Sequence, residues 1–375
     1  MSSVRAVIVG GGIGGLTAAL ALRSAGAEVG VYEQAPYLGE VGAGVAIAPA
    51  GMRVLRRLGV AEEVTRLAGT VAAVEARRPD GTSMGGPSFG AGGSAMGMYR
   101  PDLVETLAAA LPDGVLHTGH RCVTFGQDER SARVAFDNGV SVEADMVVGA
   151  DGIHSVLQHH VVEPRPPVFS GRIAYRGVLP ADRLPDWPRD AAALWNGEGK
   201  RFLTFPVHAG ELRNFTGFVP ADEEMRESWS APGDPAALAA EFSGWDPRLR
   251  ELIARIETTF RWGLYDRDPL PHWTRGRLTL LGDAAHAMLP HMGQGANQSI
   301  EDAMALATLV RGRDAAGVPE ALIRYERLRR DRTALIQEGS RVNGARMNTE
   351  YRPGVDRSGI DDYDIEAEAE AERQA

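Results

Sequence analysis

The 375-residue sequence has a single cysteine, Cys122, which excludes an intramolecular disulfide and any metal site built from several cysteines. We therefore expect a chain adapted to a reducing compartment, the cytoplasm. Apolar runs of transmembrane length are absent, and Met1 leads directly into a strand pattern without a signal-peptide pattern. There is no basic patch with interleaved aromatics to indicate nucleic-acid binding, and no spacing of histidines and carboxylates that requires a metal.

The net charge of −10 is concentrated at the C-terminus. Residues 360–375 carry seven acidic side chains and one arginine, which leaves about −4 for the rest of the chain. A strongly acidic surface on the folded body is therefore not expected. Because charge of one sign favours solvation over burial, we expect the tail at 349–375 to be a frayed helix or disordered, and we assign it no catalytic role.

The N-terminal residues follow a strand, helix, strand pattern. A β-branched run at 5–10 ends in a glycine cluster, an Ala- and Leu-rich helical pattern occupies 16–25, and a second short strand occupies 28–32. The glycines fit the spacing G-x-G-x-x-G, which provides a tight turn, close approach of backbone N–H groups to a pyrophosphate, and helix–strand packing. A carboxylate at the end of the second strand can accept hydrogen bonds from ribose hydroxyls. The predicted dinucleotide-binding residues here are Gly10, Gly12, Gly14, Gly15, Glu33 and Gln34.

This motif alone does not distinguish an NAD-binding site from an FAD-binding site. The alternative interpretation is a glycine-rich turn that binds no nucleotide, with Glu33 as an ordinary surface acid.

The rest of the chain predicts an α/β fold. A helix is expected at 98–111, a hairpin turn at 137–139, and two helices at 298–310 and 319–347. Between them the pattern changes to strand-like pieces at 173–179, 202–207 and 214–219, with one helical stretch at 249–256.

We therefore expect a discontinuous, Rossmann-like nucleotide-binding domain, an inserted β-sheet domain and a long C-terminal helix. The nucleotide-binding domain is assigned to residues 1–70, 98–167 and 269–348, the inserted sheet domain to 71–97 and 168–268, and the acidic tail to 349–375.

Two further signatures follow apolar strands. The first is Gly149-Ala150-Asp151-Gly152, and the second is Gly282-Asp283 with the loop from Pro290 to Asn297. On these residues the chain resembles the FAD-dependent aromatic-ring monooxygenases, the group A flavoprotein hydroxylases, and especially the branch of salicylate hydroxylase and 6-hydroxynicotinate 3-monooxygenase. The resemblance covers roughly residues 4–340, with the motifs in family order and spacing.

The resemblance implies non-covalent FAD. In the family, the residue matching Asp283 hydrogen-bonds a ribityl hydroxyl, and the following loop presents backbone N–H groups to the edge of the flavin that is anionic when reduced. An arginine matching Arg100 contacts the cofactor, and Cys122 lies near the position whose backbone meets the adenine. Asp151 structures its turn. The implied cofactor residues also include Pro290, Gly293, Gln294, Gly295, Ala296 and Asn297.

The sequence departs from the family at Gln158, where an arginine is frequent. The contacts to the nicotinamide cofactor, and the choice between NADH and NADPH, therefore stay open.

The family places substrate between the flavin and the inserted sheet. Ala46 and Phe205 stand where the hydroxynicotinate branch has base-like residues, which predicts a more apolar pocket suited to an indole or a large phenol rather than a small anionic acid. The candidate catalytic residues are His291 and Arg201, and the pocket candidates are Ala46, Tyr175, Arg176, Trp195, Leu203, Phe205, Phe215, Gly217 and Met292.

The activity implied is hydroxylation of an electron-rich phenolic or indole-type aromatic, with NADH or NADPH as reductant, O₂ as oxidant and a flavin C4a-hydroperoxide as the oxygen donor. The alternative is a flavin-dependent reductase or dehydrogenase without oxygen insertion. The expected partner is a small aromatic molecule, not nucleic acid or a membrane, and the expected state is a monomer or homodimer.

Overall fold

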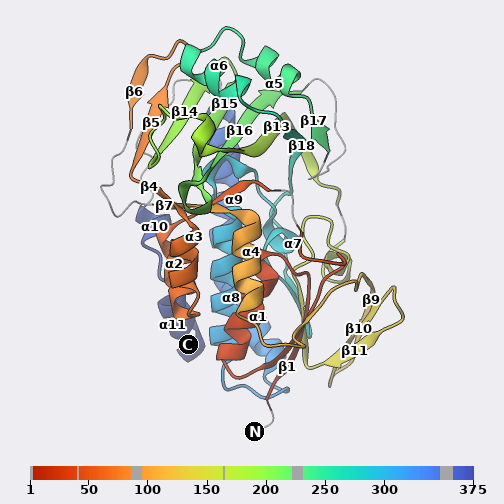
Figure 1. Cartoon of the computed structure of the whole chain (residues 1–375). Helices are drawn as coiled ribbons and strands as arrows, with labels where there is room; N and C mark the ends of the chain where they lie inside the picture. Colours follow the sequence, from red (N-terminus) through yellow and green to blue (C-terminus); the bar gives the residue numbers. More distant parts are fainter. Residues whose placement is uncertain (1–2, 40–41, 87–94, 164, 222–230, 347–357) are drawn as a thin grey trace.

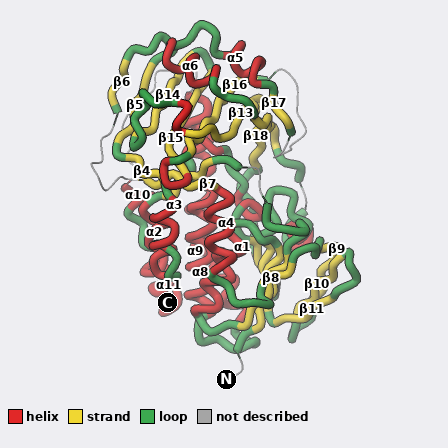
Figure 2. The backbone as a smooth tube through the Cα atoms, viewed as in Figure 1, coloured by secondary structure: helices red, strands yellow, loops and turns green. Residues whose placement is uncertain are grey.

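The computed structural model describes residues 3–39, 42–86, 95–163, 165–221, 231–346 and 358–375. Within them, an eight-stranded sheet lies above a layer of helices and a six-stranded sheet, and two three-stranded sheets lie beside these (Figures 1 and 2). The fold is therefore the predicted α/β arrangement. Stretches of the chain that form the six-stranded sheet alternate with stretches that form the eight-stranded sheet.

The six-stranded sheet carries the predicted βαβ unit. Its order is β19–β20–β12–β1–β2–β8, and every neighbouring pair is parallel except β19 with β20. The apolar runs in β1 and β12 are buried almost throughout, as expected for parallel strands covered on both faces. Their carboxyl ends lead into the loops that carry the glycine and Asp-Gly motifs. The strands are β1 (Arg5–Val9), β2 (Glu28–Tyr32), β8 (Leu116–His117), β12 (Met146–Gly149), β19 (Thr274–Arg275) and β20 (Leu278–Leu280).

Helix α8 (Gly295–Val310) is the central helix of this layer and is buried on nearly every side. It packs against α1, α2, α9 and α11 (Ile365–Gln374), so its polar side chains as well as its apolar ones are buried. Its N-terminus points toward the eight-stranded sheet (Figure 1). The other helices of the layer are α1 (Ile13–Ser24), α2 (Pro49–Arg57), α3 (Ala61–Leu67), α4 (Arg100–Ala109), α7 (Asp283–His286) and α9 (Val318–Ala345).

A fully buried ionic cluster fixes α8 against α9. Arg329 of α9 donates to Glu301 at 2.9 Å and to Asp302 at 2.7 Å, and all three side chains are 0% exposed. Asp302 also accepts from His286 at 2.6 Å and from the Gly282 backbone N–H at 3.1 Å. Every charge in the cluster is paired, which offsets the cost of burying it. The cluster therefore fixes the turn at Gly282 through the hydrogen bond from the Gly282 backbone N–H to Asp302.

The eight-stranded sheet has the order β17–β18–β13–β16–β15–β14–β5–β6. Every neighbouring pair is antiparallel except β5 with β14, which are parallel. Strands β5 and β6 precede the other strands of this sheet in the chain. Helices α5 (Pro235–Glu241) and α6 (Pro247–Ala254) cover its outer face, and the other face points toward the helical layer (Figure 1). Its strands are β5 (Ala73–Arg77), β6 (Ser83–Gly85), β13 (Val168–Pro180), β14 (Ala191–Gly197), β15 (Lys200–Val207), β16 (Leu212–Pro220), β17 (Pro232–Gly233) and β18 (Thr259–Asp266).

Two small sheets complete the described part of the chain. The predicted hairpin turn is confirmed, since Gly139 has a φ of +85° between β10 and β11. The predicted helix start at Met98 is wrong, because Met98 and Tyr99 end a strand and α4 begins at Arg100, with Pro101 in its first turn. The strands are β3 (Gly44–Ile47), β4 (Gly69–Val71) and β7 (Ala95–Tyr99) in one sheet, and β9 (Cys122–Gln127), β10 (Ala132–Phe136) and β11 (Ser141–Ala144) in the other.

Of the two states expected for the acidic tail, a frayed helix or disorder, residues 358–375 adopt helix, and residues 349–357 lie outside the described part. Helix α10 (Ser358–Asp361) is followed by α11 (Ile365–Gln374), which packs on α8 and α9. Ile365 and Ala369 are buried, and glutamates on the helix pair with arginines of the body, such as Glu366 with Arg57. The acidic side chains of α11 thus pair with arginines of the folded body, and composition alone does not reveal these pairs.

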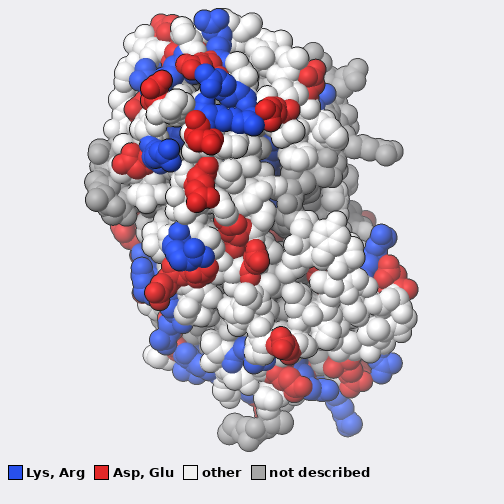
Figure 3. Space-filling model, viewed as in Figure 1, with Lys and Arg blue, Asp and Glu red and all other residues white. Residues whose placement is uncertain are grey.

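Among the described residues, no helix is both long and apolar enough to span a membrane, and no group of three or more His, Cys, Asp or Glu side chains could hold a metal. On the face shown in Figure 3, basic and acidic side chains are interspersed over the eight-stranded sheet and the helices below it. That face lacks the one-sign basic surface that a polyanion needs.

Candidate active site

A cavity of about 1430 Å³ runs between the two large sheets. Its wall is made by the glycine loop after β1, the Asp-Gly turn after β12, the Gly-Asp turn after β20, the loop before α8 and the inner face of the eight-stranded sheet. Typical small-molecule pockets occupy about 300–1,000 Å³. The cavity therefore has room for a long cofactor together with a second, smaller molecule.

The glycines at one end have three distinct geometric roles. Gly10 has a φ of +112°, and a Cβ there would lie 2.2 Å from the Ala150 carbonyl oxygen. A Cβ on Gly15 would lie 1.9 Å from the Gly10 carbonyl oxygen, so only glycine lets α1 pack on the turn. A Cβ on Gly12 would meet no protein atom within 4 Å, and Gly12 lines the cavity. The chain thus leaves backbone open to the cavity at the N-terminus of α1.

Glu33 and its neighbours form the far end of the cavity. Glu33 accepts from the Gly11 backbone N–H at 2.6 Å and from the Ala35 N–H at 2.8 Å, and it lines the cavity beside Gln34. Its carboxylate therefore also ties the glycine loop to β2. Cys122 lines the cavity here, and burial raises the pKa of its thiol to about 12, so it serves packing rather than chemistry.

Asp151 structures the turn after β12, as predicted from the sequence. Its Oδ2 accepts from the backbone N–H groups of Val156 and Leu157, at 2.8 and 3.3 Å. Its Oδ1 is buried without a hydrogen-bond partner in the described structure, and burial raises the carboxyl pKa. Gln158, at the position of the frequent family arginine, is 1% exposed and donates to the Ala284 carbonyl at 2.9 Å. It therefore joins two loops and does not face the cavity.

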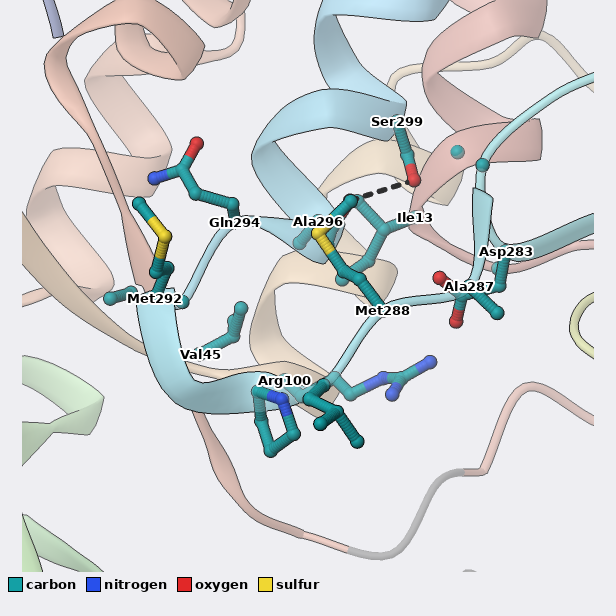
Figure 4. Close-up of a pocket in the computed structure, with 18 of the residues that line it drawn as sticks. Ile13, Val45, Arg100, Asp283, Ala287, Met288, Met292, Gln294, Ala296 and Ser299 are labelled. Carbon is teal, nitrogen blue, oxygen red and sulfur yellow. Dashed lines mark hydrogen bonds between the residues drawn. The ribbon is translucent and has the colours of Figure 1, made fainter. Parts of the chain in front are cut away.

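Asp283 opens α7 and lines the middle of the cavity. Gly282 before it has a φ of +64°, which turns the chain sharply after β20. Burial raises the pKa of the Asp283 carboxyl, and the charges of His286 and Arg100 partly oppose that shift. Figure 4 shows the Arg100 side chain extended toward Asp283 beneath the loop that carries Met288. This pair provides an acceptor and a cation at the cavity's midpoint.

The loop from Pro290 to Gly295 leads into the N-terminus of α8. Gly293 adopts a φ of +63°, and Gln294 is 1% exposed with its side-chain Nε2 buried and without a hydrogen-bond partner. The first backbone N–H groups of α8 have no partners within the helix, so the positive end of its dipole faces this part of the cavity. The residues that line it include Pro290, Gly293, Gln294, Gly295 and Ala296.

Asn297 has a different role from the one expected. It donates to the carbonyl oxygens of Ala46 and Gly293, both at 2.9 Å, and accepts from the Ala48 N–H at 2.9 Å. It is not among the residues that line the cavity. Asn297 therefore holds the end of β3 and the start of α2 against the loop before α8, and a Cβ at Gly293 would lie 3.9 Å from Ala46 Cβ, so these two residues are neighbours in the cavity wall.

The inner face of the eight-stranded sheet closes the remaining end of the cavity. Seven of the predicted pocket and catalytic residues line the cavity: Ala46, Arg176, Arg201, Leu203, Phe205, His291 and Met292. Sequence reasoning missed several further lining residues. They come from the eight-stranded sheet, from the three-stranded sheet of β3, β4 and β7, and from the end of α9: Ala192, Thr216, Phe218, Trp262, Val71, Met96 and Asn343.

Four predicted pocket residues do not reach the cavity. Successive side chains of a strand point to opposite faces, and the prediction took one residue of β13, one of β14 and two of β16 from the face that points away from the cavity. Tyr175, Trp195 and Phe215 belong instead to the apolar core under α5 and α6, and Gly217 lies against Leu238 of the same core. The neighbours Arg176, Thr216 and Phe218 occupy the cavity face.

Two buried arginines stand on that face. Arg201 is 6% exposed and donates to Asn196 Oδ1 at 3.0 Å and to the Asn343 carbonyl at 3.5 Å. Arg176 is 8% exposed, with its guanidinium 5.1 Å from the centre of the Trp262 ring. Both arginines were predicted from the sequence, and they add two cations to the apolar pocket expected around Ala46 and Phe205. The arrangement favours an anionic group on the bound molecule.

A family model described as an FAD binding domain matches residues 3–340. Over 348 residues the chain is 41% identical to a 3-amino-4-hydroxybenzoate 2-monooxygenase of Streptomyces platensis, a match that covers 91% of this chain and 87% of that protein. The chain belongs to the FAD-dependent aromatic hydroxylases. It is accordingly a flavin monooxygenase that uses NAD(P)H and O₂ to hydroxylate an aromatic substrate.

Other members of the family match nearly the whole chain. A salicylate hydroxylase of Pseudomonas putida is 35% identical over 370 residues, which is 91% of this chain and 85% of that protein. A solved structure of a Klebsiella pneumoniae HpxO variant complexed with FAD superposes with a TM-score of 0.83 and 27% identity, and covers 99% of this chain and 95% of that one. The aromatic hydroxylase fold therefore extends over both large sheets.

The cavity of this hydroxylase fits FAD in its chemistry as well as its length. Gly12 leaves space for a pyrophosphate at the α1 N-terminus. Asp283 offers an acceptor for a ribityl hydroxyl, and the N-terminus of α8 offers backbone N–H donors to the flavin edge. The lining of the cavity thus offers a matching group to each of these three parts of the cofactor.

The pH dependence of kcat/KM will have no limb from His291. Burial and the nearby charges of Arg201 and Arg172 lower the pKa of His291 to about 3, so its imidazole is already neutral at pH 6. We expect log kcat/KM for the aromatic substrate to show no inflection between pH 6 and 8 that depends on this residue. Steady-state rates at saturating NAD(P)H measure this directly. A limb near pH 6.5 that disappears in His291→Gln would contradict it.

Proposed function

We propose that this hydroxylase acts on a small aromatic acid, a benzoate that carries a hydroxyl or amino substituent on its ring. The observation that carries the proposal is the pair of buried arginines, Arg176 and Arg201, on the cavity face of the sheet. A guanidinium matches a carboxylate in charge and in hydrogen-bond geometry. The 41% identical relative is named for an aminohydroxybenzoate, which supports the same class.

The apolar residues around these arginines suit an aromatic ring. Leu203 and Phe205 of β15, Phe218 of β16 and Met96 of β7 line the space between the arginines and the loop before α8. In this proposal the carboxylate binds at the sheet and the ring extends toward Ala46 and the loop. The anionic end then fixes which end of the ring faces the cofactor.

FAD supplies the oxygen-activating chemistry when bound, and the chain's own residues supply position and a dry environment. With FAD bound, the N-terminus of α8 would stabilise negative charge at the flavin edge, and Asp283 and Arg100 would hold the middle of the cofactor. No described residue forms a second glycine-rich nucleotide site. The nicotinamide cofactor is therefore proposed to bind transiently to the same face, with NADH or NADPH left as alternatives.

The experiment that tests this function uses the purified protein with a panel of aromatic acids and indoles. We expect a yellow protein whose NAD(P)H oxidation is stimulated by aminohydroxybenzoates or hydroxybenzoates, with one ¹⁸O atom from O₂ in the product. Stimulation by indoles alone would overturn the proposed acid. Turnover of substrate without oxygen incorporation would favour the alternative reductase or dehydrogenase.

We propose further that the enzyme works in the cytoplasm, as a monomer or homodimer. A buried, unreactive single cysteine and a requirement for NAD(P)H are compatible with a reducing compartment. Light scattering of the FAD-loaded protein will decide between the two oligomeric states.

A further inference from the structure

Thr216 is a polar side chain on the cavity face of the eight-stranded sheet. It lies in the middle of β16, between β13 and β15, and it is one of the residues that line the cavity. The adjacent Phe215 points to the opposite face, into the apolar core under α5 and α6. Because both edges of β16 are paired with other strands, the accessible surface of the half-buried Thr216 belongs to its side chain and faces the cavity.

The Thr216 hydroxyl has no partner among the residues that the structure describes. It makes no hydrogen bond to them, and its oxygen retains accessible surface, so it is open to the cavity. Two other threonines of the sheet differ in this respect. Thr204 donates to the Asn214 carbonyl at 2.7 Å, and Thr259 donates to the Arg176 carbonyl at 3.2 Å. The Thr216 oxygen is therefore available to a bound molecule, whereas theirs are engaged within the sheet.

Apolar side chains and cations surround this hydroxyl. Leu203 of β15 is directly opposite Thr216 in the sheet register, and Phe218 is the next residue on the same face of β16. On the other side Arg176 of β13 is directly opposite Thr216, and Arg201 of β15 is opposite Phe218. Leucine and phenylalanine side chains form no hydrogen bonds, and arginine only donates. Thr216 therefore supplies an acceptor where these four neighbours supply none.

The register also places Thr216 beside both arginines. It is directly opposite Arg176 and diagonal to Arg201, and residues in both relations are close enough for their side chains to share a ligand. Thr216 thus adjoins the aromatic ring whichever arginine holds the carboxylate. A planar acid that is held at its carboxylate alone can still turn about the bond to its ring, and a second contact on the ring removes this freedom.

We propose that the Thr216 hydroxyl accepts a hydrogen bond from the ring hydroxyl or amino group of the aromatic acid, and that it thereby favours substituted acids over benzoate. The inference rests on the proposed function and extends it to the substituent on the ring. A hydroxyl or amino group loses its hydrogen bonds to water when it enters a cavity lined by Leu203 and Phe218. Thr216 replaces one of them, which makes it a specificity-determining contact.

The test compares two substitutions of Thr216 with two ligands. Affinities of FAD-loaded wild type, Thr216→Val and Thr216→Ser for benzoate and 3-amino-4-hydroxybenzoate are measured by the change in flavin absorbance. We expect the wild type to prefer the substituted acid by about 10- to 100-fold. The preference will fall about tenfold in Thr216→Val, because valine has nearly the same shape but no acceptor, and will stay within about threefold of wild type in Thr216→Ser.

Thr204→Val is the matched control. Thr204 lies on β15 of the same sheet, but its fully buried side chain is on the face that points away from the cavity. The control loses a hydroxyl and a buried hydrogen bond, so its melting temperature will fall while its preference between the two acids stays at the wild-type value. The fraction of NAD(P)H that yields hydroxylated product rather than hydrogen peroxide will fall only in Thr216→Val, because a turned ring no longer presents its reactive carbon.

The possible failures are distinguishable. Equal loss of affinity for both acids in Thr216→Val would overturn the inference and indicate a packing role, and an unchanged preference in that variant would overturn it as well. If the FAD-loaded wild type binds neither acid, the proposed function fails and this inference with it. If the wild type binds both acids with equal affinity, only the inference fails.

Discussion

A Gly12→Val variant will fold with nearly wild-type stability but lose at least 100-fold in affinity for FAD. Gly12 lines the cavity with extended backbone, φ −76° and ψ −176°, which any residue adopts. Its Cβ would meet no protein atom within 4 Å, so the valine side chain enters only the space assigned to the pyrophosphate. The apoprotein melting curve and a fluorescence titration with FAD measure the two effects separately.

Two other glycines are the controls for this prediction. Gly126→Val on the exposed strand β9 also meets nothing within 4 Å, so both stability and FAD affinity will stay near wild type. Gly14→Val will instead unfold or strongly destabilise the protein, because a Cβ there would lie 2.8 Å from Leu281 and 3.1 Å from Ser299. Undiminished FAD binding in a folded Gly12→Val protein would place the pyrophosphate elsewhere.

An Arg201→Met variant will raise KM for the aromatic acid about 100-fold, which is about 3 kcal/mol. The substitution keeps an unbranched, largely apolar side chain but removes the guanidinium, a buried cation that lines the substrate end of the cavity. In the variant, a carboxylate bound there has no counter-charge and little water to replace it, so it binds more weakly. Arg201→Lys will recover part of the loss, since a lysine retains the charge but not the bidentate geometry. Steady-state kinetics with 3-amino-4-hydroxybenzoate measure both variants.

Arg261→Met is the matched control for Arg201. Arg261 lies on β18 of the same sheet but on the outer face, where its guanidinium is 6.0 Å from the centre of the Tyr175 ring. Its loss removes an arginine without changing the cavity, so KM will stay within about twofold of wild type. An equal rise of KM in both variants would show that the sheet as a whole, rather than the cavity-facing cation, is responsible.

The sequence predicted the cofactor end of the site well because each motif there is a backbone requirement. Gly10 and Gly15 are needed where a Cβ would clash with the turn, and Asp151 accepts the backbone N–H groups of its own turn. Such requirements are local, so they are visible in residue types at fixed spacing. The hairpin at Gly139 was predicted for the same reason.

The substrate end was predicted less well because it depends on which face of a strand points inward. A shift of one residue exchanges the faces, and the register of β13 with β16 is set by long-range pairing. Tyr175 and Phe215 were therefore assigned to the cavity, and Thr216 and Trp262 were missed. The helix α11 was hidden for a similar reason: its acidic residues pair with arginines such as Arg57 that lie far away in the sequence.

The central claim is that one continuous cavity holds FAD along its whole length and an aromatic acid beyond the flavin. A crystal structure of the protein with FAD and 3-amino-4-hydroxybenzoate tests it most directly. The account predicts a pyrophosphate beside Gly12, a ribityl chain at Asp283, a flavin edge at the α8 N-terminus, and a carboxylate within hydrogen-bond distance of Arg201 or Arg176. An acid bound with its carboxylate away from both arginines, or a cofactor outside the cavity, would contradict it.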